Sequence, residues 1–290
     1  MTSTWGEEAK PRVGFFTDTT VCIGCKACEV ACKEWNQVPE DGFVWTGHSF
    51  DNTGELSGST WRHVAFIEQQ QPIAVVEEAG LDLPPRPEGM DFRWLMSSDV
   101  CKHCTEAACL DVCPTGAIFR TEFGTVVIQD DVCNGCGYCI TACPFGVIGR
   151  RERDDGGVQH GLGAHDGGAH KCTLCYDRLQ DDLEPACAKA CPTESIQFGP
   201  LDELLERARE RCEEVVEAGA ESARLYGHDR EDGVGGFGAF FLLLDDPEVY
   251  GLPPDPVVTT RDLGEIWGAA AAAAVTLGAA VVGAIAFGGR

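Results

Sequence analysis

Sixteen of the seventeen cysteines in this 290-residue chain fall into four groups of four, and this regularity limits the folds that the chain can adopt. The groups are Cys22, Cys25, Cys28 and Cys32; Cys101, Cys104, Cys109 and Cys113; Cys133, Cys136, Cys139 and Cys143; and Cys172, Cys175, Cys187 and Cys191. The first and third groups have the spacing C-x2-C-x2-C-x3-C, whereas the middle gap widens to four residues in the second group and to eleven in the fourth. The last three groups each end in Cys-Pro.

This spacing is typical of ferredoxins that bind [4Fe–4S] clusters. A cubane cluster needs four thiolates that converge tetrahedrally, and three cysteines close together in one loop can supply three of them. In two-cluster ferredoxins the fourth cysteine of such a run ligates the other cluster, so the groups work in pairs. Four groups of four therefore predict four [4Fe–4S] clusters with all sixteen cysteines as ligands.

Two other uses of cysteine compete with this interpretation. Zinc also takes four cysteines, but four runs of four, two of them with the full ferredoxin spacing, favour clusters. Disulfides would suit a secreted chain, whereas the first eleven residues, MTSTWGEEAKP, contain acids and lack the apolar core of a cleavable signal peptide. Cys212 stands outside every group, in the helix-like stretch LDELLERARERCEEVVEAG, and is expected to be a free cysteine rather than a ligand.

The segments between the groups differ in character. Residues 117–119 and 126–128 are apolar and flank a turn at residues 122–124, which predicts a hairpin between the second and third groups. Residues 37–99 contain strand-like pieces such as HVAFIE and a proline-rich turn at residues 83–87. Residues 152–169 are rich in Gly, Asp and His and indicate a flexible insertion.

Acidic residues dominate the charge of the chain. Asp and Glu number 47 against 22 Lys and Arg, which gives a formal net charge of −25. Nucleic acids and anionic lipids are bound through clusters of Lys and Arg. The composition therefore argues against a nucleic-acid partner.

The C-terminal segment is apolar enough to enter a membrane. Residues 268–287 carry no charge, and twenty helical residues at about 1.5 Å each can cross a hydrocarbon core of about 30 Å. Trp267 precedes them where an interfacial aromatic residue would lie. The alternative is an alanine-rich helix packed on a partner; length favours a single transmembrane helix, and small residues also suit helix packing inside a membrane.

Distinctive residues flank the cysteine groups and extend beyond them. Residues 18–36 read DTTVCIGCKACEVACKEWN, with Lys-Glu-Trp-Asn where other ferredoxin motifs have proline. Residues 137–147 read GYCITACPFGV, residues 170–199 read HKCTLCYDRLQDDLEPACAKACPTESIQFG, and EVYGLPPDP at 248–256 follows ERCEEVVEAGAESARLYG. Together these segments resemble the iron–sulfur (beta) subunits of the molybdenum- or tungsten-dependent, membrane-associated formate dehydrogenases.

The resemblance implies an α+β fold of two nested bacterial-ferredoxin-like domains, a C-terminal helical arm and a single transmembrane helix. It implies that Cys22, Cys25 and Cys28 share a cluster with Cys191, that Cys172, Cys175 and Cys187 take Cys32, that Cys101, Cys104 and Cys109 take Cys143, and that Cys133, Cys136 and Cys139 take Cys113. The expected parts are residues 12–36 with 170–199 as one ferredoxin-like domain, 37–94 as a covering insertion, 95–150 as the second such domain, 151–169 as a flexible loop, 200–261 as the arm and 262–290 as the anchor.

The resemblance also implies what the chain does. No nucleophile with a base, dinucleotide-binding glycine loop or flavin site is found along the sequence, so catalysis is expected in a partner. In the family a large molybdopterin subunit oxidises formate, and the electrons pass through the clusters to a membrane cytochrome b or other quinone-linked subunit. The expected role is thus a non-catalytic, membrane-anchored electron-transfer subunit. The cysteine pattern alone is shared with subunits of dimethyl-sulfoxide, polysulfide and nitrate reductases and of some hydrogenases, so these remain the alternative; the Trp-Asn tail and the C-terminal arm favour formate.

Overall fold

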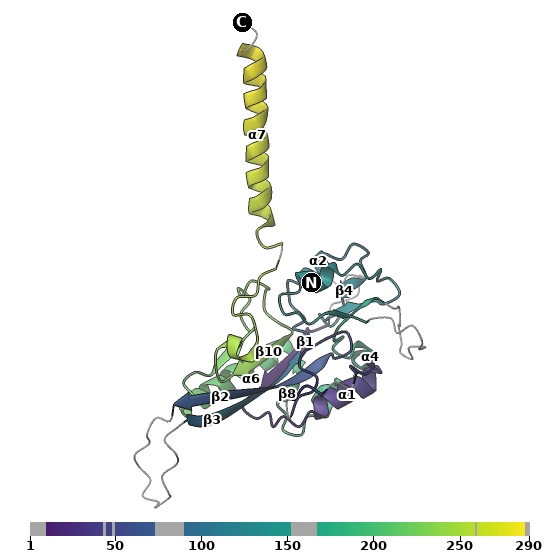
Figure 1. Ribbon diagram of the computed structural model, residues 1–290, viewed down its shortest axis with the longest axis vertical. Coiled ribbons are helices and arrows are strands. Elements are labelled where there is room, and N and C mark those ends of the chain that lie inside the picture. The colour runs from purple at the N-terminus through teal and green to yellow at the C-terminus, as the bar shows by residue number, and fades with distance from the viewer. Residues whose placement is uncertain are drawn as a thin grey trace, which may run out of the picture.

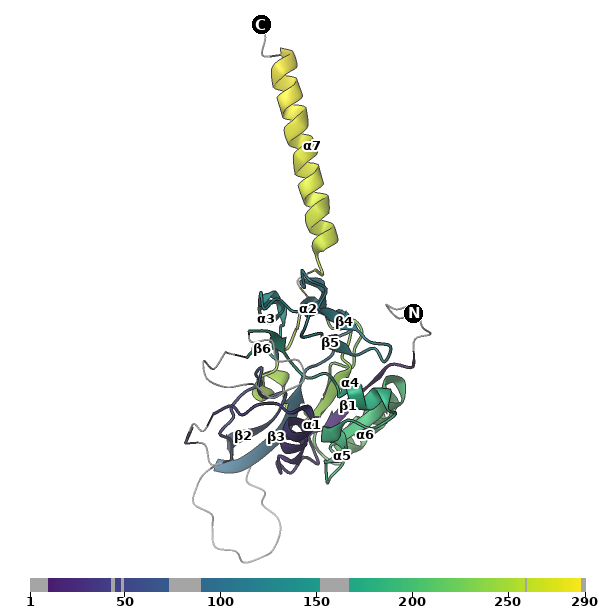
Figure 2. The same ribbon diagram turned by 90° about the vertical axis from the view of Figure 1, so that its right-hand side faces the viewer.

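A computed structural model of the chain describes residues 10–42, 45–47, 50–72, 90–151, 167–258 and 260–287. One long helix, α7 (Leu263–Phe287), projects from a body that contains the other elements (Figures 1 and 2). The helix ends close to the C-terminus. The predicted C-terminal helix is therefore present, and its side chains are exposed along almost its whole length.

A four-stranded sheet lies at the centre of the body, in the order β8-β1-β10-β9. Strand β1 (Val13–Asp18) is antiparallel to β8 (Ile196–Pro200) and parallel to β10 (Ala239–Leu243), and β10 is antiparallel to β9 (Arg224–Tyr226). The middle strands are apolar at their centres, where Phe15 and Phe240 have no exposed surface. A Cβ atom on Gly14 would lie 2.2 Å from the carbonyl oxygen of Gly238, so this close approach of two strands requires glycine.

Helix α6 (Leu201–Glu217) covers this sheet through Leu204 and Ala208, which are buried with Phe16 in one apolar cluster. The helix-like stretch around Cys212 is thus a helix, as predicted. Strands β9 and β10 come from residues 200–261, the stretch expected to form a C-terminal arm. They complete the sheet of β1 and β8, because their apolar residues are buried in the same core as those of β1.

Three antiparallel pairs surround the sheet. The pair β4 (Ile118–Arg120) and β5 (Val126–Ile128) forms the predicted hairpin, with its first strand one residue later than expected and Gly124 at φ 77° in the turn. HVAFIE lies in β2 (Arg62–Pro72), which pairs with β3 (Met90–Val100). The short strands β6 (Gly149–Arg150) and β7 (Ala169–His170) also pair.

Two predicted segments fall partly or wholly outside the described residues. The proline-rich turn at residues 83–87 lies outside them, as do residues 152–166 of the expected flexible insertion. The end of that insertion is described, and it is ordered in a strand, since Ala169 pairs with Arg150.

Short helices follow the cysteine loops and hold the third cysteine of each group. They are α1 (Ala27–Asn36), α2 (Ala108–Asp111), α3 (Tyr138–Ala142) and α5 (Ala186–Lys189), and α4 (Tyr176–Gln180) lies within the long gap of the fourth group. Helix α1 packs against α5, and α2 packs against α3. The first group is therefore placed beside the fourth, and the second beside the third. A 3-10 turn, η1 (Pro247–Tyr250), follows β10, and Leu252 and Val258 beyond it are still buried in the core.

Candidate metal centres

The structure brings the sixteen grouped cysteines together in four sets of three plus one. We number the sets by the group that supplies three thiols: site I (Cys22, Cys25, Cys28, Cys191), site II (Cys101, Cys104, Cys109, Cys143), site III (Cys133, Cys136, Cys139, Cys113) and site IV (Cys172, Cys175, Cys187, Cys32). These are the sets that the resemblance implies. All seventeen cysteines of the protein are free thiols in the structure.

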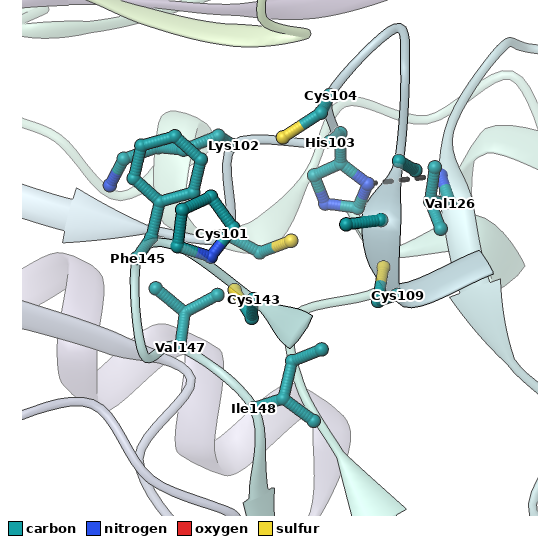
Figure 3. Close-up of a pocket in the computed structure, with 13 residues that line it drawn as sticks. Cys101, Lys102, His103, Cys104, Cys109, Val126, Cys143, Phe145, Val147 and Ile148 are labelled. Atoms are coloured by element: carbon teal, nitrogen blue, oxygen red, sulfur yellow. Dashed lines mark hydrogen bonds between the residues drawn. The ribbon is translucent and has the colours of Figure 1, made fainter. Parts of the chain in front are cut away.

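Site II is a pocket whose wall carries all four of its thiols (Figure 3). Apolar side chains, among them Phe145, Val147 and Ile148, form much of the remaining wall. Burial, together with the neighbouring Cys101 and Cys143, raises the pKa of Cys109 to about 12 against the opposing charge of Lys171. Thiols that resist ionisation individually but face one another need a bound cationic group to become thiolates together, and iron supplies that charge.

Site I is a second pocket lined by its four cysteines. Val64 and Ile196 provide an apolar wall, and Ser98 adds a polar group whose Oγ lies 3.2 Å from the sulfur of Cys28. Burial raises the pKa of both Cys22 and Cys28, as in site II. The lining fits an iron–sulfur group: four thiols, few competing polar ligands and little room for water.

Site IV is the most deeply buried set. Burial raises the pKa of Cys32 well above its usual value, and Cys172, Cys187 and Cys175 raise it further, which places these four sulfurs together. Hydrogen-bond donors point at the sulfurs of site IV. The backbone N–H of Leu174 donates to the sulfur of Cys172 at 3.2 Å. The amide of Asn36 lies 3.7 Å from the sulfur of Cys32 and 3.8 Å from that of Cys175. Asn36 ends the Trp-Asn tail, so this tail contributes directly to the site.

Site III reaches the surface on one side, as does site I through its exposed Cys25. Burial, together with Cys133, Cys113 and Cys136, raises the pKa of Cys139 to about 11, while Cys136 itself is exposed. Its loop turns through Gly135 at φ 70° and Gly137 at φ 80°, a left-handed conformation that glycine adopts without strain. An exposed edge of this kind suits contact with a partner protein.

Neighbouring sites meet through particular cysteines. Cys139 of site III raises the pKa of Cys109 in site II, after burial and nearer charges. Burial and then Cys101 of site II raise the pKa of Cys172 in site IV. Cys187 of site IV contributes in the same way to the raised pKa of Cys28 in site I. The sites are therefore neighbours in the order III–II–IV–I, and we call this order the row.

The row has a defined orientation relative to α7. Helices α2 and α3, which hold the third cysteines of sites II and III, lie at the end of the body from which α7 emerges, whereas α1 and α5 lie farther away (Figure 2). A hydrogen bond of 3.0 Å from the hydroxyl of Thr260 to a carboxylate oxygen of Asp111 on α2 fastens the start of α7 to this end.

The described thiols are not arranged around single metal ions, and Cys212 lies apart from the four sites. Within the described part of the protein, no three His, Cys, Asp or Glu side chains are arranged to hold a single metal ion. Thiols that bind one zinc ion stand about 2.3 Å from it, closer together than thiols at the corners of a cubane. Cys212 lies on α6 beside the apolar core of the sheet, with Ala223 O 3.9 Å from its sulfur, and belongs to none of the four sites.

Three buried basic residues beside the sites were not singled out from the sequence as buried groups. Arg62, His103 and Lys171 have exposed fractions of 2%, 1% and 2%. The backbone N–H of Val126 donates to Nδ1 of His103 at 3.1 Å, so the neutral ring carries its proton on Nε2. This Nε2 is buried and has no partner in the part of the chain that the structure describes, and the ring lies against the site II thiols (Figure 3). The sequence Cys-Lys-His-Cys at residues 101–104 places His103 between two expected ligands, and this position could have indicated that the ring lies beside site II.

Lys171 lies between two sites. Its ammonium group donates to the carbonyl oxygens of Val126 and Cys172, the latter at 3.1 Å. Burial lowers its pKa, but Cys101 and Cys109 of site II and Cys172 of site IV outweigh this effect, so the pKa is raised and the cation is retained.

Comparison with known proteins extends over most of the sequence. Two families described as "4Fe-4S dicluster domain" match residues 92–201 and 21–117. The nitrate-inducible formate dehydrogenase iron–sulfur subunit of Escherichia coli is 38% identical over 258 residues, which are 87% of this chain and 76% of the relative. The formate dehydrogenase iron–sulfur subunit of Haemophilus influenzae is 37% identical over 253 residues, 86% of this chain and 71% of the relative. The B subunit of the E. coli anaerobic dimethyl sulfoxide reductase is 33% identical over 193 residues, 67% of this chain and 76% of the relative.

Proposed function

The chain belongs to the family of formate dehydrogenase iron–sulfur subunits, and from this premise we propose that it relays electrons from a molybdopterin subunit that oxidises formate to a quinone-linked membrane subunit such as a cytochrome b. The observation that carries the proposal is the single row of four cysteine sets. A row of redox sites joining two ends of a protein suits conduction, and substrate chemistry is assigned to the partner. This chain is then the non-catalytic subunit of the complex.

Each site would bind one [4Fe–4S] cluster through its four thiolates, four in all. When bound, such clusters supply one-electron oxidation and reduction at potentials within roughly −700 to +450 mV, set by burial, nearby charge and hydrogen bonds to sulfur. Residues beside the sites supply hydrogen bonds that would adjust these potentials. Asn36 and the N–H of Leu174 donate to sulfurs of site IV, and Nε2–H of His103 is available to donate at site II.

The orientation of the row supports a direction of flow. Site III lies at the end from which α7 emerges, so we assign the membrane partner to this end and the catalytic partner to the end of site I (Figure 2). Within Leu263–Ala286 of helix α7, an 18-residue window has a mean hydropathy of 2.1, and none of that window is buried in the protein. Its length and composition suit a single membrane anchor, which would place the complex at the cell membrane.

Formate is favoured over the alternative substrates by the extent of the similarity. The formate dehydrogenase relatives match 86–87% of the chain, whereas the dimethyl sulfoxide reductase subunit matches 67%. The cysteine sites alone do not separate these classes, because both kinds of subunit carry such groups.

The direct test is reduction by formate. The chain, purified with its large subunit, should lose part of its visible absorbance and develop paramagnetic signals on addition of formate, because thiolate-bound iron is being reduced. Quinone should then be reduced only when the membrane subunit is present. Reduction by hydrogen or by a sulfur compound, with formate inert, would assign the chain to a sister enzyme.

Metal content tests the ligand sets. We expect about sixteen iron atoms and about sixteen inorganic sulfides per chain, four of each per site. Cys212→Ser should leave both contents unchanged, because its thiol lies outside the sites. Stoichiometric zinc without broad visible absorbance would rule out the clusters, and loss of iron in Cys212→Ser would contradict the ligand assignment.

A further inference from the structure

Arg62, the first residue of β2, is a buried cation with incomplete hydrogen bonding. Its exposed fraction is 2%, and its Nη1 donates to Oγ of Ser98 at 2.9 Å and to the carbonyl oxygen of Ser98 at 3.2 Å. Its Nε and Nη2 are also buried, and neither has a hydrogen-bond partner among the described residues. Three of its five N–H groups are therefore unused, since Nε carries one and Nη2 carries two.

No carboxylate neutralises this guanidinium within the described ranges, where every ion pair of Asp or Glu is made with another residue. The ring of Phe15 lies 5.0 Å from the guanidinium carbon, which adds a cation–π contact but no negative charge. An unpaired, partly unsatisfied cation in a protein interior is strongly unfavourable. The missing negative charge must therefore come from a group that binds beside Arg62.

Cysteine sulfurs of two sites lie near enough to Arg62 to act on its charge. Burial lowers its pKa, but the sulfurs of Cys187, Cys28, Cys172 and Cys32 outweigh this effect and the pKa is raised. Cys28 belongs to site I and the other three belong to site IV. Ser98, which accepts from Arg62, lies 3.2 Å from the sulfur of Cys28, so the contact continues to a ligand of site I.

We propose that Arg62 is a positioning residue shared by sites I and IV: its unused N–H groups donate to the sulfurs of the clusters bound there, and its fixed charge raises the reduction potential at both sites. The inference rests on the proposed cluster ligation. A fixed cation stabilises the more negative, reduced form of an anionic iron–sulfur group, and donors to its sulfurs act in the same direction. The covering insertion thereby contributes to the electron pathway, because β2 carries this charge inward.

A purely structural role is the competing explanation, since Arg62 also joins β2 to Ser98 of β3. Two variants separate the explanations. Arg62→Gln removes the charge and keeps one amide donor, whereas Arg62→Lys keeps the charge and loses the planar set of donors. Arg93→Gln is the matched control: Arg93 lies on β3, contacts Asp245 at 3.5 Å and Leu244 O at 2.9 Å, and belongs to no cysteine site.

The measurement is a redox titration of the purified complex, followed by electron paramagnetic resonance, together with iron content. In Arg62→Gln, two of the four midpoint potentials should fall by at least about 59 mV each. For a one-electron couple this fall is about a tenfold decrease in the equilibrium constant for reduction. Arg62→Lys should move the same two potentials less, and Arg93→Gln should move none.

Full iron content with all four potentials unchanged in Arg62→Gln would overturn the proposal. If Arg62→Gln fails to retain its iron, Arg62→Lys decides: a fall confined to two potentials supports the role, and four unchanged potentials contradict it. Failure of the proposed ligation is distinguishable, because the unsubstituted complex would then lack the four signals altogether.

Discussion

Cys101→Ala is expected to stop the flow of electrons from formate to quinone while leaving half of the row reducible. Cys101 is a proposed ligand in site II, which lies between site III and the pair of sites IV and I. Loss of one thiolate should empty site II, so iron should fall from about sixteen to about twelve atoms per chain. Formate should still reduce sites I and IV, because they lie on the catalytic side of the gap, and site III should remain oxidised.

The measurement combines iron analysis, formate-dependent bleaching and quinone reduction in the intact complex. Cys212→Ala is the matched control, since it removes a thiol of intermediate exposure that belongs to no site. Quinone reduction at the unsubstituted rate, with iron at about twelve atoms, would show that electrons bypass site II and that the row is branched. Unchanged iron would show that Cys101 is not a ligand.

The second large effect is expected on membrane association. Val275 lies near the middle of α7 and is 72% exposed in the isolated protein. A lysine at the centre of a membrane-spanning helix costs about 2.5 to 3.5 kcal/mol. Val275→Lys combined with Val281→Lys should therefore move the complex from the membrane pellet to the soluble fraction, without loss of iron, because every proposed ligand precedes α7.

Glu265→Lys is the control for that experiment. It adds the same side chain within the first turn of α7, where a lysine can reach the membrane surface at little cost. Membrane association should survive this substitution. An unchanged pellet fraction for the Val275 and Val281 double variant would mean that a partner subunit supplies the anchor.

Local signals in the sequence predicted several elements correctly. The hairpin of β4 and β5 was predictable because two short apolar runs flank a glycine that occupies a left-handed turn position. Helices α6 and α7 followed from amphipathic and uniformly apolar runs. The cysteine spacing indicated iron–sulfur sites without reference to any long-range contact. The ligand sets stay a prediction, although the structure places their sulfurs together.

Long-range pairing and buried charge could not be predicted in the same way. Phe15 pairs with Ala239 across more than two hundred residues, and no local pattern specifies which distant strand completes a sheet. Arg62 and Lys171 are basic residues, which are normally expected at the surface. Arg62 keeps its charge beside sulfurs that all come from distant segments, and the sequence around Arg62 gives no sign of them.

The nesting of the cysteine sets also determines the order in which the sites can be completed during translation. Sites II and III use residues between Cys101 and Cys143, so both can be complete when only half of the chain has left the ribosome. Sites I and IV each combine cysteines before position 33 with cysteines after position 171. The central sheet, in which β1 pairs with β10, can form only after β10 has been synthesised. The first cysteines made are thus among the last to find their partners. Until then, a nascent chain exposes the thiols of its first group without the structure that shields them, and these thiols are open to oxidation and to stray metal ions.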